Sequence, residues 1–135
     1  MGVKQKHTIS IKEMSEVVLK RLVFFEGDTP NFEKRINDFI FDQRYKLLDI
    51  TMLEWDRYQR HYHIGLLVEE QLKFFRQNCL VLEARDPEIM TKDLDDFSSV
   101  MAKAKNIEYD INFIKTFRIR TPRGEKYYSY VLYQD

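Results

Sequence analysis

The last thirty residues constrain the fold most strongly, because their apolar side chains follow a strand-like pattern. Six apolar residues between positions 107 and 119 fall on odd positions, and only Lys115 interrupts this series: Ile107, Tyr109, Ile111, Phe113, Phe117 and Ile119. A period of two is typical of a β-strand with one buried face. The segment Thr121-Pro122-Arg123-Gly124 has the composition of a turn, and Lys126–Tyr133 follows as a second strand. The sequence therefore predicts a long antiparallel hairpin at the C-terminus.

Upstream of the hairpin, apolar residues recur at helical spacing. Two segments, beginning at Ser10 and Thr51, have the pattern of a capping box, which marks the start of a helix. Helices are predicted over Ile11–Phe25, from Pro30 toward Leu47, from Thr51 through Leu66, and over Thr91–Lys105. The stretch from His61 to Val68 also alternates like a strand, so its state stays open. A short buried strand is predicted over Cys79–Ala84.

Together these elements predict a single α+β domain over residues 1–135, mostly helical and closed by the hairpin. This outline is winged-helix-like, a resemblance of architecture alone. Residues 12–17 and 31–36 are similar in residue class to residues 92–97 and 112–117. An internal duplication, with halves at approximately 8–60 and 88–135, would explain both matches. The alternative is that the starts of amphipathic helices resemble one another.

The charge balance excludes one class of function. The chain has 22 Lys plus Arg and 22 Asp plus Glu, so it cannot bind polyanions through overall positive charge. The single cysteine, Cys79, cannot form an internal disulfide and is expected to be a buried, inert thiol. No apolar stretch is long enough for a signal peptide or a membrane span. We therefore expect a cytoplasmic protein that does not bind membranes.

Basic residues gather around the hairpin turn, although the total charge is zero. Arginines at such a tip suit contacts with phosphates or with a minor groove. The alternative is an ordinary solvated tip whose charges prevent edge-to-edge aggregation. The predicted DNA-binding residues are Arg118, Arg120, Arg123 and Lys126 of the hairpin, with Lys34 and Arg35 of the second predicted helix.

His61-Tyr62-His63 is the one motif with metal-ligand character. It resembles the histidine–hydrophobic–histidine (HUH-like) metal motif of rolling-circle replication and relaxase nucleases, which implies a metal-dependent nuclease with an attacking tyrosine. On a strand both rings would share one side, whereas on a helix they would point about 200° apart. Because the Thr51 capping box favours a helix, we expect no metal ligands at His61 and His63. No other catalytic pattern appears in the sequence, so we expect no catalytic residues and no cofactor.

Aromatic residues of the hairpin are expected to be buried or to lie at a dimer interface, with stacking on unpaired bases as the alternative. Phe97 and Phe117 are predicted to be core residues. The function predicted first is that of a non-enzymatic DNA-binding accessory or regulatory protein of winged helix-turn-helix type, with double-stranded DNA as its partner. A protein–protein interaction module, such as an inhibitor or assembly factor, is the second prediction. The metal-dependent nuclease is the third.

Overall fold

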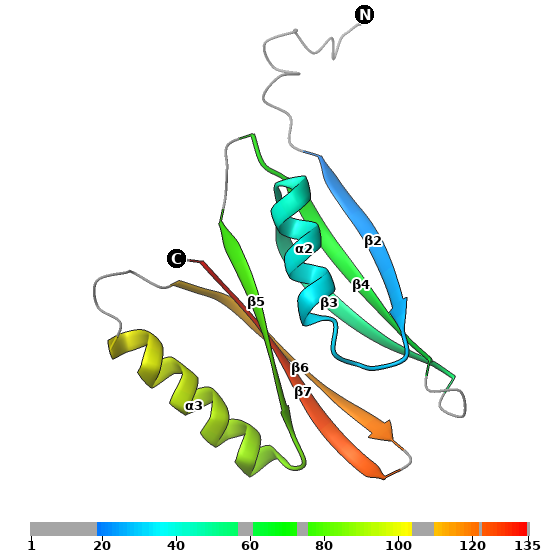
Figure 1. Cartoon of the computed structure of the whole chain (residues 1–135), viewed down its shortest axis with the longest axis vertical. Coiled ribbons are helices and arrows are strands. Elements are labelled where there is room, and N and C mark those ends of the chain that lie inside the picture. The colour runs from blue at the N-terminus through cyan, green and yellow to red at the C-terminus, as the bar shows by residue number, and fades with distance from the viewer. Residues whose placement is uncertain (1–18, 57–60, 73–75, 104–109, 122, 135) are drawn as a thin grey trace, which may run out of the picture.

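The computed structural model describes residues 19–56, 61–72, 76–103, 110–121 and 123–134 (Figure 1). Within these ranges strands predominate over helices. The elements in chain order are β2 (Lys20–Gly27), α2 (Glu33–Gln43), β3 (Tyr45–Asp56), β4 (His61–Glu70), β5 (Gln77–Ala84), α3 (Pro87–Lys103), β6 (Asp110–Thr121) and β7 (Gly124–Gln134).

The strands form two three-stranded antiparallel sheets with the same topology. Sheet 1 has the order β2-β4-β3 and sheet 2 the order β5-β7-β6. In each sheet the first strand lies at one edge, a helix crosses to the other edge, and the third strand returns through the centre. Two successive βαββ units thus build the described part of the chain.

This shared topology does not by itself establish a duplication of the sequence. Residues 12–17, which begin the proposed sequence match, lie outside the described residues. In the second match, residues 31–36 lead into α2 whereas residues 112–117 lie within β6. The duplication with halves at approximately 8–60 and 88–135 therefore stays a prediction.

The prediction of a mostly helical, winged-helix-like domain is wrong. The segment after Thr51 forms part of β3, and residues 20–25 of the first predicted helix belong to β2; its residues 11–18 lie outside the described part. A capping box is a short local pattern, and pairing with β4 outweighs it at Thr51. In β4 the alternation of residues 62, 64, 66 and 68 marks the buried face, so the open segment is a strand.

Two predicted helices are present, with different bounds. In α2, the Asn31 side chain accepts a hydrogen bond from the backbone N–H of Glu33 at 3.0 Å, and the helix ends at Arg44, which has a left-handed conformation with φ 54°. At α3, the Asp86 side chain accepts from the N–H of Ile89 at 2.9 Å, and Pro87 occupies the first helical position.

The C-terminal hairpin is present as β6 and β7, paired from Asp110 to Gln134. It is not a separate wing, because β7 is also the centre of sheet 2. Tyr128 and Tyr130 are buried, which agrees with the prediction of burial. Phe117 packs against the core cluster, and the Phe97 ring lies 5.6 Å from that of Tyr133; both phenylalanines are half-buried.

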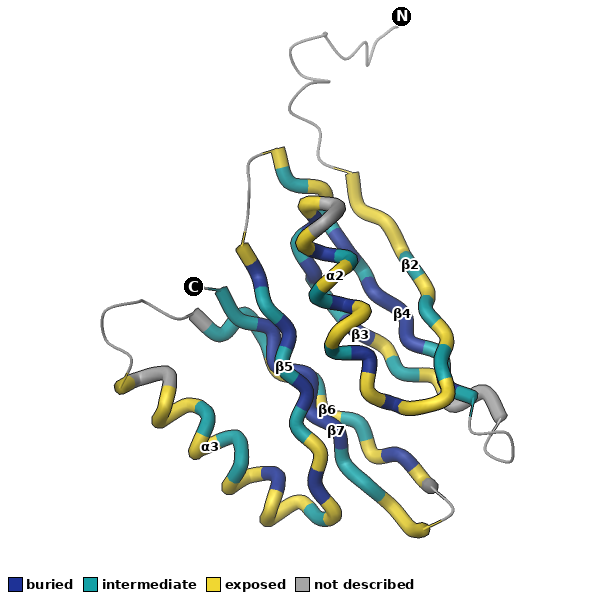
Figure 2. The backbone as a smooth tube through the Cα atoms, viewed as in Figure 1, coloured by how far each residue is buried: buried dark blue, intermediate teal, exposed yellow. Residues whose placement is uncertain are grey.

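One core joins the two units (Figure 2), and α2 contacts both sheets. The Asn37 amide accepts from the N–H of Cys79 at 2.7 Å and donates to its carbonyl oxygen at 2.8 Å. Cys79 is buried as predicted, and burial raises the pKa of its thiol. Gln77 lies in the same core, where its amide accepts from the N–H of Leu47 and donates to the carbonyl oxygen of Leu47. These side chains hold β5 against the first unit.

Sheet 1 has an inner face, which packs on α2 and sheet 2, and an outer face. Alternation places the buried residues Tyr62, Ile64, Leu66 and Val68 of β4 on the inner face. The intervening residues His61, His63, Gly65, Leu67 and Glu69 then lie on the outer face, with their pairing partners in β2 and β3. Leu22, Phe24 and Leu53 of this face have 62%, 56% and 47% of their surface exposed.

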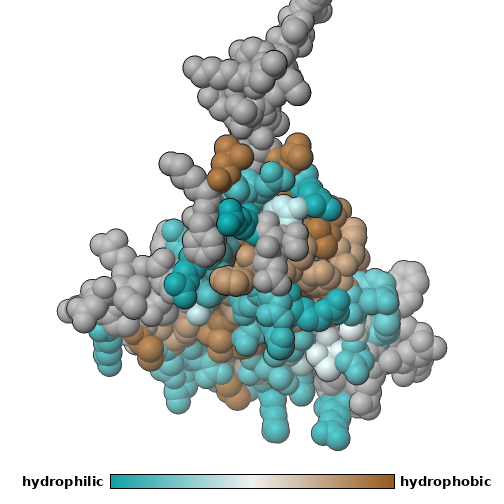
Figure 3. All heavy atoms as spheres, turned by 45° about the horizontal axis from the view of Figure 1, so that its top comes forward, coloured by the Kyte–Doolittle hydropathy of each residue, from teal (hydrophilic) through white to brown (hydrophobic). Residues whose placement is uncertain are grey.

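Hydrophobic residues also reach the surface on the side of the molecule seen in Figure 3. Neither helix of the described ranges is long and apolar enough to cross a bilayer.

Candidate metal centre

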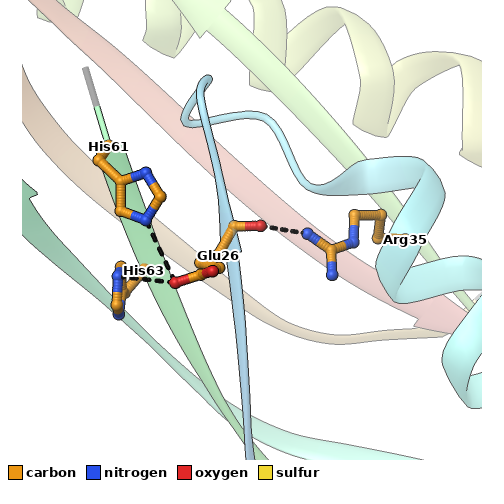
Figure 4. A network of polar contacts seen from close by, with 4 residues as sticks. All are labelled: Glu26, Arg35, His61 and His63. Carbon is orange, nitrogen blue, oxygen red and sulfur yellow. Dashed lines mark hydrogen bonds and ion pairs between the residues drawn. The ribbon is translucent and has the colours of Figure 1, made fainter. Parts of the chain in front are cut away.

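The register of sheet 1 brings three metal-ligating side chains to one end of the outer face. Glu26 of β2 lies directly opposite His63 of β4, and His61 is two residues away on the same side of β4. Figure 4 shows both imidazole rings pointing toward the Glu26 carboxylate. Gly27 ends β2 immediately after this glutamate, so the cluster lies at the end of the strand pair.

The donor atoms lie close together. The Oε2 atom of Glu26 is 3.2 Å from Nε2 of His61 and 3.4 Å from Nε2 of His63. One ligand atom from each of the three residues lies within 4.8 Å of the others. The side chains of His61 and His63 are 37% and 27% exposed, and that of Glu26 is 65% exposed, so the site is open to solvent on one side.

The backbone of Glu26 is held from the other side of the sheet. The Arg35 guanidinium of α2 donates a hydrogen bond to the carbonyl oxygen of Glu26 (Figure 4) and lies 4.7 Å from the ring centroid of Phe25. The hydrogen bond from His61, followed by its charge, holds the pKa of the Glu26 carboxyl below its ordinary value. Glu26 is therefore an anion over a wide pH range, as a metal ligand must be.

The reason for expecting no metal ligands at His61 and His63 was the helix predicted through them, and that helix is not formed. On the strand, the two ring centroids are 5.2 Å apart. Glu26 was not predicted from the sequence, because it lies 37 positions before His63 and only strand pairing brings the two together. The alternation of β4 was the signal that could have found the histidine pair.

The residues predicted to bind DNA come from the hairpin and from α2, and several are engaged in other contacts. Arg118 forms an ion pair with Glu125 at 3.1 Å, and Lys126 forms one with Glu83 at 2.7 Å. Arg120 and Arg123 are exposed.

On α2, Lys34 is paired with Asp38 at 2.7 Å, and Arg35 is bound to the backbone of β2. Contacts within the chain thus offset part of the positive charge on which the DNA prediction rests.

A tyrosine beside the histidines would favour the nuclease prediction. Among the described residues, Tyr62 lies on the inner face of sheet 1, and Tyr45, Tyr128 and Tyr130 are buried. No tyrosine of β2, β3 or β4 in the described ranges lies on the outer face. Tyr58 is outside those ranges.

Comparison of the chain with family models, with curated proteins and with solved structures finds no match.

Proposed function

We propose that this protein binds a divalent transition-metal ion, of the class of Zn²⁺, through Glu26, His61 and His63. The observation that carries the proposal is the approach of two imidazole nitrogens and one carboxylate oxygen on an open sheet face. Two histidines and one carboxylate are a ligand set that suits zinc and related ions. Imidazole ligands disfavour Mg²⁺ and Ca²⁺, which prefer oxygen donors.

The two donor spacings that involve Glu26 are those of a tetrahedral ion. Ligand atoms about 2.0–2.1 Å from a tetrahedral zinc ion lie roughly 3.3 Å from one another. The two distances from Glu26 Oε2 to the imidazole nitrogens are 3.2 Å and 3.4 Å. In the metal-free protein, the imidazole of His61 donates a hydrogen bond to the Glu26 carboxylate at 3.2 Å. Metal binding would replace this polar contact.

Three protein ligands leave a fourth tetrahedral position open. Solvent can reach the cluster in the single chain, because all three side chains are partly exposed. Such a position takes water or an anionic group, and the bound ion acts as a Lewis acid toward it. Glu26, fixed by Arg35 and the strand pairing, contributes the charge that offsets part of the charge of the ion.

Isothermal titration calorimetry with Zn²⁺ on EDTA-treated, dialysed protein tests this function. We expect one ion per chain in the wild type and a loss of affinity of at least tenfold in His63→Ala and in Glu26→Gln. Glu70→Gln, which changes an exposed carboxylate at the other end of β4, is the matched control and should bind like the wild type. Equal affinity in all four proteins would contradict the proposal.

DNA binding by the hairpin stays a prediction, separate from this proposal. It now concerns a hairpin that belongs to sheet 2 and has partly neutralised charges, since Arg118 and Lys126 have acidic partners.

A further inference from the structure

The outer face of sheet 1 has an apolar centre beside the metal cluster. Leu22 and Phe24 of β2 are exposed, and Leu67 of β4, which lies opposite Leu22, is half-buried. On β3 the polar residues Asp49 and Thr51 lie level with this centre, and the exposed Leu53 lies opposite His63. The Phe24 ring lies across Gly65, where an added Cβ would be 3.0 Å from the ring. A contiguous exposed apolar surface of this kind is typical of a protein contact site.

The two ends of the same face have complementary charges. At one end the register places Lys20, Glu69 and Lys46 side by side across the three strands. At the other end, six residues away along β2 and along β4, lie Glu26 and His63, with Leu53 beside them on β3. The face therefore presents a lysine and then a glutamate along β2, and the two ends of that strand are complementary in charge.

A two-fold axis that lies in the plane of contact, perpendicular to the strands, would bring these ends together. If it passes between the levels of Leu22 and Phe24, Lys20 of one copy meets Glu26 of the other, because the two are equally far from the axis. Leu22 then meets Phe24 of the second copy. Both pairs occur twice in the dimer.

The same axis also relates the β4 strands of the two copies, because β4 is in fixed register with β2. Lys20 and Glu26 pair with Glu69 and His63, so Glu69 of one copy meets His63 of the other. Leu67 meets the surface over Gly65, where no side chain rises from β4. On β2 the one axis thus pairs Lys20 with Glu26 and Leu22 with Phe24, whereas on β3 it sets Lys46 opposite Leu53.

We propose that the outer face of sheet 1 binds a second copy of this chain, face to face and with antiparallel strands. Stacked sheets pack about 10 Å apart with their strands within about 30° of each other, a geometry that such a face allows. Three strands of about eight residues cover roughly 25 by 14 Å, which is less than the usual area of about 800 Å² per partner in a stable complex. The dimer is therefore reversible.

Analytical ultracentrifugation in EDTA, from about ten micromolar to the millimolar range, tests the dimer without any metal ion. We expect wild-type self-association that depends on concentration. Lys20→Glu and Glu26→Lys should each weaken it at least tenfold, because each places like charges opposite one another. An equimolar mixture of these two variants should associate again, since both charged pairs are restored with reversed sign in one half of the heterodimer.

Two further variants keep the test specific. Leu22→Asp should abolish association, and its circular dichroism spectrum should match that of the wild type, because Leu22 is 62% exposed. Val100→Asp, on the exposed side of α3, is the matched control and should associate normally. A monomeric wild type, a mixture that stays monomeric, or an equal loss in Val100→Asp would overturn the proposal. Metal binding is judged separately by calorimetry, so either proposal can fail alone.

Discussion

The two βαββ units have the same topology, yet their central strands are buried differently. In sheet 2, residues 128 to 132 of β7 are buried without interruption, because α3 covers one face while α2 and sheet 1 cover the other. In sheet 1, only alternate residues of β4 are deeply buried, apart from Gly65, and the outer face keeps exposed leucines and phenylalanine. The fold thus requires both faces of sheet 2 but only one face of sheet 1, which leaves the other face available for function.

The largest expected effect comes from comparing two leucines on opposite faces of sheet 1. Leu66 is fully buried whereas Leu22 is 62% exposed. Leu66→Ala should lower the free energy of unfolding by about 2–5 kcal/mol, and Leu22→Ala by less than about 1 kcal/mol. Urea denaturation at low micromolar concentration measures both. Similar losses would mean that the outer face is as important for folding as the inner one.

A smaller effect is expected where the two units are joined. Gln77→Leu removes both hydrogen bonds to the backbone of Leu47 and one to Asn112. Unsatisfied buried groups cost about 1–3 kcal/mol each, so a loss of about 2 kcal/mol in unfolding free energy is expected. Gln71→Leu, a glutamine just after β4, is the control and should lose less than half as much. The same urea experiment decides between them.

The next prediction concerns the arginines of the hairpin and their contribution to DNA binding. If it contacts DNA, Arg118, Arg120 and Arg123 changed together to Ala should flatten the slope of log affinity against log salt by about 0.9 for each lost phosphate contact. Because Arg118 is already paired with Glu125, we expect the slope to change by less than the loss of three phosphate contacts would give. Fluorescence anisotropy with duplex DNA measures the slope. An unchanged slope would place any DNA contact elsewhere.

The smallest effect concerns the apo metal site. Since the pKa of Glu26 is lowered in the folded protein, its stabilising contribution is present above the ordinary pKa and is lost as the pH falls through the folded value. Glu26→Gln should therefore make the decline in stability less steep as the pH falls below the ordinary pKa of a glutamate. Denaturation at several pH values checks this. An equally steep decline in both proteins would argue against the contact with His61.

Local patterns predicted some elements and failed at others for identifiable reasons. The alternation before Thr121 identified the hairpin, and the apolar spacing around Ile36 and Leu94 identified the two helices. The capping box at Thr51 led to a wrong helix prediction. The preference of two residues for the start of a helix is outweighed there by the hydrogen bonds that pair the whole strand with β4. In the site, the histidine pair was visible in the sequence, but its meaning depended on whether residues 61–68 form a strand.

Glu26 could not be predicted, since its position beside His63 exists only in the paired sheet. The ion pair that offsets the charge of Lys126 likewise forms only in the folded structure. Glu83, the partner of Lys126, comes from β5, far from the hairpin in the sequence.

The absorption spectrum of a Co²⁺ titration is the most direct test of the claim that the outer face of sheet 1 holds a metal ion. Co²⁺ replaces Zn²⁺ in such sites, and its visible bands intensify in tetrahedral coordination. We predict intense bands that saturate at one ion per chain in the wild type and in Glu70→Gln, and that are absent in His63→Ala. Weak bands without saturation, or a wild-type spectrum in His63→Ala, would contradict the account.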